Sequence, residues 1–445
     1  MYRIQEWWWR AVAVEVAVLV MVWAGGTAAQ EPALELEEVV VTAQRYATPE
    51  LTTPAHTTVI SGDVLARSGG RTVTEALRAT GGFDYVAYSP LGINQGGMNS
   101  ELPIRGVPDG ELVLIDGLPL QNPSGGGYDL NTIPLAAIER VEIVKGSAST
   151  LYGSAAMTGV INIITRQPQG PQGTLQSEGG NNAYARSSIT GGGDAWLVTL
   201  NHTHLGAVDR VATSYTSFWE YDQMPTDDYG AMVRVTPLPG LTLGWLGSQE
   251  QTGFARNPWT DRPVRAANTH KGTVQESNRN LATLACAQDG FSLTGAYLSD
   301  LMWYDVDDGT GRNATDFFRW SVNPQYHGTS DDIDYLLGGE WQGDKVKSSA
   351  YGARRRQNAS AYGTVTVHPL APLAVTLGGR QQWVRQKDAA DYSTFTPQAQ
   401  ASWQVDGKIA VYANAGRAFR APDLTRLYRS TALLRGNPDL KPEQG

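Results

Sequence analysis

The sequence holds few residues whose types and spacing could perform catalysis. It contains no Gly-x-Ser-x-Gly nucleophile elbow, no His-Glu-x-x-His zinc pair and no phosphate-binding loop. Acidic residues are plentiful, but nothing in their spacing singles out a pair for general acid and base work. We therefore expect that the protein is not an enzyme and that it needs no cofactor.

Two groups of residues resemble parts of metal sites. Residues 305–309, Asp-Val-Asp-Asp-Gly, resemble part of a calcium loop, but they lack the downstream glutamate that completes an EF-hand. This segment is more typical of a solvated turn. His202 and His204 alternate along one strand and could contact a metal, although such residues more often line a polar lumen. We assign no metal site.

A third feature indicates binding rather than catalysis. Residues 37–43 read Glu-Glu-Val-Val-Val-Thr-Ala within a polar, proline-flanked segment. So short a run of β-branched residues cannot build a core, but it can add as a strand to the exposed sheet edge of a partner. It could equally be the first strand of the domain that follows. The residues of this candidate binding segment are Glu38, Val39, Val40, Val41, Thr42 and Ala43.

The segment follows an N-terminus that is typical of an export signal. Arg3 and Arg10 supply positive charge, residues 11–24 are mostly apolar, and residues 27–29 offer a small-residue cleavage site. An uncleaved membrane anchor is the alternative. After residue 24 no stretch approaches the roughly 18 apolar residues of a transmembrane helix. Such an exported chain is either soluble or a β-barrel, because only helices and closed barrels satisfy the backbone in lipid.

Composition narrows the classes of partner. The formal net charge of −9 and the pI near 5.3 argue against nucleic acid as a binding partner. The single cysteine, Cys286, excludes an intrachain disulfide and a multi-cysteine metal site. The 49 glycines, 13 tryptophans and 19 tyrosines suit many short strands with tight turns, a composition that a soluble β-rich protein shares.

Two regions with different patterns follow the candidate binding segment. Residues 46–168 predict a compact α+β unit, with one helix capped by Ser61 and a second capped by Thr72 or Thr74. Strands are expected at residues 102–105, 112–115, 141–144 and 160–165. From residue 173 onward, alternating segments recur between turn residues, at 195–205, 230–235, 241–246, 291–298, 362–367, 373–377 and 409–413. This alternation is typical of transmembrane β-strands, although a soluble sandwich gives a similar pattern.

Several short sequence motifs in the α+β unit identify a protein family far more specifically than the composition does. They are Pro103–Gly106, Val113–Gly117 and Ile138–Gly146, the last continuing through residues 151–154 to 159–165. Over more than a hundred residues this stretch resembles the plug domain of TonB-dependent outer-membrane receptors. Residues 419–422, Phe-Arg-Ala-Pro, and the phrase at 436–443 also resemble that family. Haem receptors carry a histidine between two such motifs. Residues 423–435 contain no histidine, which argues against haem as the ligand.

The resemblance implies an all-β transmembrane β-barrel of about 22 strands, with an N-terminal α+β plug domain. Residues 174–445 hold only about 11 to 14 strands at roughly 20 to 25 residues per strand and connection, so we expect an incomplete barrel, about half of the full one. The implied organisation is a signal peptide at 1–29, a periplasmic segment with a TonB box at 30–45, a plug at 46–168 and a partial barrel at 169–445.

The implied function is TonB-dependent active transport of a scarce, bulky ligand across the outer membrane of a Gram-negative cell. A ferric siderophore is the first candidate ligand and cobalamin the alternative. The implied partners are a TonB-type periplasmic energy-transducing protein, which would pair with residues 38–43, and outer-membrane lipid. A passive plugged porin and a truncated, non-functional receptor product remain as other interpretations. A signalling receptor is disfavoured, because few residues separate the expected cleavage site from the box.

The resemblance also implies two sets of contact residues. Ligand contacts are expected in the plug loops 88–100 and 120–129, where the candidates are Tyr88, Asn94, Asn99, Asn122 and Tyr128. Ordinary turn residues would have the same composition. Arginines at the motif positions Arg105 and Arg140 pair with barrel glutamates in the family, and Glu340 is our candidate partner for them in a plug–barrel ionic lock.

Overall fold

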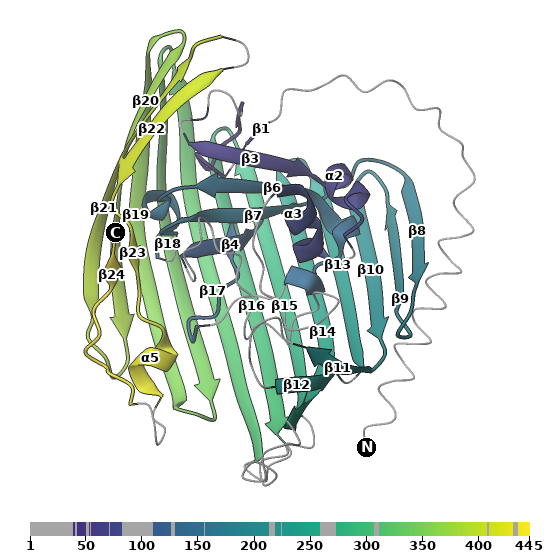
Figure 1. The fold of residues 1–445 in the computed structure, drawn as a ribbon. Coiled ribbons are helices and arrows are strands. Elements are labelled where there is room, and N and C mark those ends of the chain that lie inside the picture. Colours follow the sequence, from purple (N-terminus) through teal and green to yellow (C-terminus); the bar gives the residue numbers. More distant parts are fainter. Residues whose placement is uncertain are drawn as a thin grey trace.

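A computed structural model describes residues 39–40, 42–49, 53, 55–70, 72–81, 110–125, 130–154, 156–212, 219–223, 225–258, 273–306, 311–406, 409–429 and 435–445. A large antiparallel sheet curves around a smaller unit of mixed sheet and short helices (Figure 1). Some predicted site residues lie outside the described residues: Glu38, Val41, Tyr88, Asn94, Asn99, Arg105 and Tyr128.

The inner unit is built on a five-stranded sheet with the order β3-β6-β7-β4-β5. Its strands are β3 (His56–Ser61), β4 (Glu111–Ile115), β5 (Leu118–Pro119), β6 (Ile138–Lys145) and β7 (Gly159–Thr165). β4 and β7 run parallel, and the other pairs are antiparallel. The strands expected at residues 112–115, 141–144 and 160–165 are therefore confirmed, and the one at 102–105 lies outside the described residues.

Short helices surround this sheet. They are α2 (Gly62–Arg67), α3 (Val73–Gly81), α4 (Ser149–Tyr152) and the 3-10 turns η2 (Leu130–Thr132) and η3 (Leu135–Ala137). Ser61 caps α2 as predicted, because its Oγ accepts from the Val64 amide, and Thr72 Oγ1 accepts from the Glu75 amide at the start of α3. None of the helices in the described part of the chain has the length and apolar character that a membrane crossing would need.

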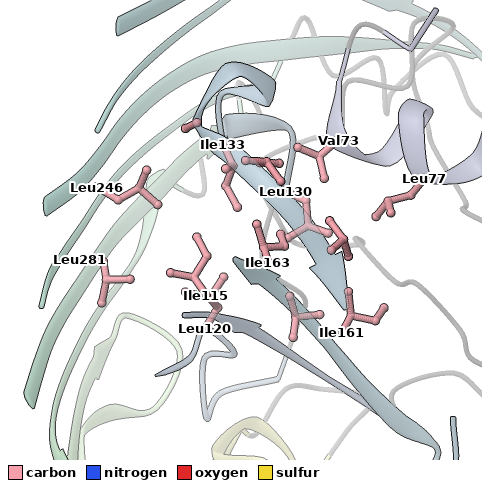
Figure 2. Close-up of a cluster of buried hydrophobic side chains, with 14 of the residues drawn as sticks. Val73, Leu77, Ile115, Leu120, Leu130, Ile133, Ile161, Ile163, Leu246 and Leu281 are labelled. Atoms are coloured by element: carbon pink, nitrogen blue, oxygen red, sulfur yellow. The ribbon is translucent and has the colours of Figure 1, made fainter. Parts of the chain in front are cut away.

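The core of the inner unit extends to the wall of the large sheet. Ile115, Ile161 and Ile163 of the inner sheet are at most 2% exposed. They belong to one buried cluster with Leu246 and Leu281 of the large sheet (Figure 2). Burial of apolar surface therefore contributes to holding the inner unit against the wall.

The large sheet has the order β22-β21-β20-β19-β18-β17-β16-β15-β14-β13-β10-β9-β8, with β12 pairing with β11 and β14 at one end. β8 and β22 are its two edges, so it is not closed into a barrel among the described residues. Its strands are β8 (Gln172–Gly179), β9 (Ala185–Gly192), β10 (Trp196–Leu205), β11 (Val208–Ala212), β12 (Trp219–Gln223), β13 (Thr226–Leu238), β14 (Leu241–Pro258), β15 (Thr273–Gln288), β16 (Phe291–Val306), β17 (Gly311–Ser330), β18 (Ile333–Ser348), β19 (Gly352–Leu370), β20 (Leu373–Gln386), β21 (Tyr392–Gln404) and β22 (Ala410–Gly416). After β22 come β23 (Phe419–Arg420), α5 (Leu424–Tyr428) and β24 (Glu443–Gln444).

The two faces of this sheet have opposite chemistry. Its inner face buries polar side chains such as Arg380, Gln382 and Thr396, and Arg380 is the largest fully buried side chain of the described residues. Its outer face exposes large apolar ones, among them Leu337 at 59% and Trp341 at 57%. A soluble protein would show the reverse arrangement, whereas lipid outside and a polar lumen inside account for it. The predicted alternation is therefore confirmed in the folded sheet.

The lengths of the connections orient the sheet. Very short turns at residues 239–240, 289–290, 331–332 and 371–372 join strands at one end of the sheet, whereas β11 and β12 lie at the other (Figure 1). In outer-membrane barrels the short turns face the periplasm and the long loops face outward. β1 (Val39–Val40) and β2 (Thr48–Pro49) lie toward the end with the short turns, which would be the periplasmic end of such a barrel, and α5 lies toward the opposite end (Figure 1).

Candidate functional site

The predicted TonB box continues into a tight hairpin on the plug. β1 and β2 pair antiparallel, with Val40 opposite Thr48, and the chain turns between them at Arg45, whose φ is 64°. Val40, Thr42 and Ala43 are buried, at 0%, 1% and 4% exposure. In this state the described part of the box cannot offer an accessible edge to a partner. A partner strand could pair with it only after the segment leaves its place.

Thr42 is the anchor of this segment. Its amide and its Oγ1 both donate to Glu142 Oε2, at 2.7 and 2.6 Å. Its Oγ1 accepts from Asn162 Nδ2 at 2.9 Å, and its carbonyl accepts from the Tyr152 hydroxyl at 2.9 Å. Glu142 and Asn162 lie opposite each other on β6 and β7, so the plug sheet itself holds Thr42. Burial raises the pKa of Tyr152, which keeps the phenol protonated as a donor.

Glu142 has no exposed surface, and its other oxygen binds an arginine of the same strand. Arg140 Nε donates to Glu142 Oε1 at 2.8 Å, and Arg140 Nη1 donates to Glu139 at 2.8 Å. Arg140 therefore does not pair with Glu340, and that part of the predicted ionic lock is wrong. The physical reason is local, because alternate residues of a strand point to the same face and bring Arg140 and Glu142 together.

Glu340 does face the lumen, but other arginines bind it. Its Oε2 accepts from Arg380 Nη2 at 3.0 Å and lies 3.9 Å from Arg45 Nη2. Arg380 is a neighbour on the wall, and it also donates to the carbonyl of Leu151 in the plug, at 3.1 Å. An ionic contact between plug and barrel therefore exists at Glu340, with Arg45 in place of Arg140. The other predicted partner, Arg105, lies outside the described residues.

Arg45 connects the box segment to the wall. Its Nη1 donates to the Tyr362 hydroxyl at 2.6 Å, and its guanidinium carbon lies 4.5 Å from the Tyr152 ring centroid and 4.7 Å from that of Tyr362. Burial alone would lower the pKa of Arg45, but the neighbouring Tyr362, Tyr152 and Glu340 outweigh it and raise that pKa above its ordinary value. Arg45 therefore stays charged between two aromatic faces.

A second charged contact joins plug and wall near the end of β4. Arg234 of β13 binds both Asp116 and Thr165 of the plug. Asp116 in turn accepts from the Thr165 amide at 2.9 Å and from its hydroxyl at 2.8 Å. The motif Val113–Gly117 therefore places its aspartate against an inward-facing arginine. Arg319 of β17 adds a bond of 3.1 Å to the carbonyl of Pro119.

At the end of the sheet opposite the short turns, the plug loop 121–125 packs against α5 and the β18–β19 turn. The Tyr351 hydroxyl donates to Ser124 Oγ at 2.6 Å, and the Leu424 amide donates to the carbonyl of Pro123 at 2.8 Å. Asn122 is the one predicted ligand contact that lies within the described residues. Its Oδ1 accepts a hydrogen bond from the Ser124 amide at 2.9 Å. Its carbonyl accepts from the Gly125 amide at 3.1 Å. Asn122 therefore shapes the turn, and ligand contact by its remaining amide group stays a prediction.

Sequence reasoning missed Arg45, Arg380 and Arg234. Arg45 lies two residues after the box, and the two wall arginines occupy inward positions of strands in which inward and outward residues alternate. An arginine at an inward-facing, polar position of a barrel strand is a signal that could have identified Arg380 and Arg234. It could not have named their plug partners, because these contacts span 229 and 118 residues of sequence.

Both regions of the chain match known families. Residues 49–160 match the TonB-dependent Receptor Plug Domain, and residues 163–445 match the TonB dependent receptor-like beta-barrel. The chain belongs to the TonB-dependent receptor family, whose members are outer-membrane transporters and receptors.

Curated relatives and solved structures agree with this assignment. The vitamin B12 transporter BtuB of Photobacterium profundum is 27% identical over 424 residues, covering 91% of this chain and 65% of the relative. BtuB of Vibrio cholerae O1 (strain M66-2) is 26% identical and covers 92% and 66%. A mutant of the ferric enterobactin receptor PfeA from Pseudomonas aeruginosa has a TM-score of 0.66 at 18% identity, covering 92% of this chain and 69% of that one. The yersiniabactin receptor FyuA from Yersinia pestis has a TM-score of 0.61 at 16% identity, covering 82% and 65%. At these identities the structures show the fold alone, and the chain spans about two thirds of the length of the BtuB relatives.

Proposed function

We propose that the chain acts in TonB-dependent active transport of a scarce, bulky ligand across the outer membrane, where its sheet lies in the lipid. Residues 38–43 would be the segment on which a TonB-type periplasmic protein pulls. The observation that carries this proposal is the attachment of Thr42 and Arg45. They tie the predicted box both to the buried carboxylate of Glu142 and to the lumen wall at Glu340. A pull on the box would therefore act on the plug and on its contact with the wall together.

The ligand is a cobalamin or a ferric siderophore. The relatives named as vitamin B12 transporters match nearly the whole chain, which favours cobalamin. The siderophore receptors among the solved structures share the fold and carry no argument about the ligand. A ferric siderophore was the first candidate ligand from the sequence, and the match to the vitamin B12 transporters makes it the second candidate.

Growth rescue tests the proposal. The gene would be expressed in a strain that lacks its own outer-membrane uptake systems, with cobalamin or a panel of ferric siderophores supplied at limiting concentration. We expect rescue by one ligand class, and we expect deletion of residues 38–43 to abolish it. Deletion of residues 30–35, which lie upstream of the box, is the matched control and should leave rescue intact.

The alternatives predict other outcomes. A passive plugged porin would support the same uptake with and without residues 38–43, which would refute energy coupling. A non-functional product would give no rescue by any ligand, although the protein is present in the outer membrane.

A further inference from the structure

The lumen side of the large sheet is apolar along one group of strands. Strands β13, β14, β15 and β16 each place a large, buried apolar side chain at an inward position, and these side chains are register partners from strand to strand. We refer to them as the apolar row, which consists of Met232, Leu246, Leu281 and Leu298. The row belongs to one buried cluster with Ile115, Ile161 and Ile163 of the plug (Figure 2). Apolar packing therefore attaches the plug to these four strands.

The inward side of β20 and β21 is mostly polar instead. Within the described part of the chain, neither strand contributes a side chain to the two buried apolar clusters that include plug residues. We refer to six of their inward side chains, all at most 8% exposed, as the polar sector: Arg380, Gln382, Thr396, Gln398, Gln400 and Ser402. The Oε1 atom of Gln398 is buried and accepts no hydrogen bond from the described residues. It is therefore an acceptor that a polar ligand could use.

The plug contacts the polar sector through hydrogen bonds of the short helix α4. The Thr150 hydroxyl donates to the carbonyl of Thr396 at 3.1 Å, and Arg380 Nη1 donates to the carbonyl of Leu151 at 3.1 Å. Bonds of this kind can be exchanged for bonds to water when the two surfaces part. Separation of the plug from the apolar row would instead expose apolar surface to water without such compensation. The plug is therefore easier to separate from β20 and β21 than from β13–β16.

The box segment is attached to the wall next to the polar sector. Arg45 donates to the Tyr362 hydroxyl on β19 and lies 3.9 Å from Glu340 on β18. Glu340 also accepts from Arg380 of the polar sector, at 3.0 Å. Arg380 is thus in contact both with the partner of Arg45 and with α4. A pull on the box would therefore act first on the side of the plug that faces β18–β20.

We propose that the plug stays on the apolar row during transport and that the ligand passes between α4 and the polar sector. The glutamine, threonine and serine side chains of this sector both donate and accept hydrogen bonds. They suit a bulky ligand that carries many hydrogen-bonding groups, and both candidate ligands are of this kind. The inference rests on the proposed transport function, to which it adds the side of the lumen that opens.

Thiol labelling during transport tests the route. Gln398 of the polar sector and Leu246 of the apolar row are almost equally buried, at 8% and 7% exposure. Each would be replaced by cysteine in the full chain after Cys286→Ser, in cells that contain a TonB-type protein. A membrane-impermeant methanethiosulfonate would be added together with cyanocobalamin or, in a parallel culture, with ferric enterobactin. The same variants without residues 38–43 report the labelling that occurs without a pull.

The two positions should respond differently to the pull. We expect Gln398→Cys to be labelled about tenfold faster with the box than without it, as when an open state rises from about 1% to about 10% of the population. Leu246→Cys should be labelled at the same rate with and without the box. Because each ratio is taken within one variant, local loosening caused by the cysteine itself cancels.

Reversible cross-linking tests which side of the plug must part. Thr150→Cys/Thr396→Cys joins α4 to the polar sector, where the two threonines are in contact. Asp116→Cys/Arg234→Cys joins the plug to β13, a strand of the apolar row, where the native side chains bind each other. A short bis-methanethiosulfonate would close each pair and a reductant would reopen it. Uptake of the radiolabelled probe should stop when the first pair is closed, recover after reduction, and continue when the second pair is closed.

Each contrary result has its own meaning. Faster labelling of Leu246→Cys with the box, or uptake that stops when Asp116→Cys/Arg234→Cys is closed, would show that the plug leaves the apolar row and would overturn the proposal. Uptake with no change in the labelling of Gln398→Cys would overturn the route and leave the transport function standing. No uptake of either probe by cells that carry the folded protein, as reported by heat-modifiable migration on gels, would refute the transport function and the route with it.

Discussion

Replacement of Thr42 by valine should release the box segment from the plug. Valine has the shape of threonine but cannot donate to Glu142 or accept from Asn162, two bonds of 2.6 and 2.9 Å. A hydrogen bond to a charged group contributes about 1.5–3 kcal/mol, and a buried donor left without a partner costs about 1–3 kcal/mol. Allowing for relaxation of the site, we expect opening of the segment to become easier by about 2–4 kcal/mol. This corresponds to an open population about 30 to 1000 times larger.

Thiol labelling measures this opening. Ala43 is 4% exposed, so a cysteine at this position reacts with a water-soluble maleimide only when the segment leaves its place. Cys286, the single native cysteine, would first be replaced by serine. The labelling rate of Ala43→Cys should then rise with Thr42→Val by the same factor as the open population, as long as reclosing is faster than labelling.

A matched control separates the site from the substitution. Thr80→Val removes a hydroxyl that bonds only to the carbonyl of Ala76 within α3, at 2.7 Å. It should leave the labelling of residue 43 unchanged. A rate for Thr42→Val within about twofold of the parent, where opening of about 2 kcal/mol predicts about 30-fold, would refute the view that these bonds hold the box.

The remaining predictions concern the two ends of the plug. Glu340→Gln removes the carboxylate between Arg45 and Arg380, and loss of one partner of a buried ion pair should lower the free energy of unfolding by about 3 kcal/mol, as measured by denaturant titration. Tyr351→Phe removes the neutral hydrogen bond of the Tyr351 hydroxyl to Ser124, so amide hydrogen exchange in residues 121–125 should accelerate about fivefold, equivalent to about 1 kcal/mol.

Matched changes on the outside of the protein serve as controls. Glu276→Gln alters a carboxylate that makes only a 3.4 Å contact with Gln249, and it should leave the unfolding free energy almost unchanged. Tyr297→Phe removes a hydroxyl from a side chain that is 49% exposed on the outer face, and it should not change exchange in the plug loop. Equal effects of Glu340→Gln and Glu276→Gln would mean that the lumen pair contributes nothing specific.

The sequence predicted the local features of this fold better than its long-range contacts. Caps at Ser61 and Thr72 and the alternation around Phe291 depend on neighbours in the chain, and the structure has all of them. Strand lengths were underestimated, since the strand expected at 241–246 extends to Pro258. Residues 247–253 of this strand are glycine or polar residues and carry no apolar alternation, but they continue the hydrogen-bonded ladder with β15.

The partner of Arg140 shows why the contact residues were harder to predict. The motif around Arg140 supplies its own acidic neighbours at positions 139 and 142, and both bind Arg140 at 2.8 Å. The wall carboxylate at Glu340 instead receives Arg45, 295 positions earlier in the chain. Sequence spacing fixes the first kind of contact, whereas only the packing of plug against wall fixes the second.

The charges around residues 42–45 are arranged so that departure of this segment would leave no buried carboxylate without a partner. When Thr42 leaves its place, Glu142 still has Arg140 at 2.8 Å, and when Arg45 leaves, Glu340 still has Arg380 at 3.0 Å. An uncompensated buried charge would cost several kcal/mol, and neither carboxylate becomes one. The work of release is therefore confined to the bonds of the departing residues themselves. The departing segment also gains water for its own charge and backbone. The same two arginines remain in position to orient both carboxylates for its return.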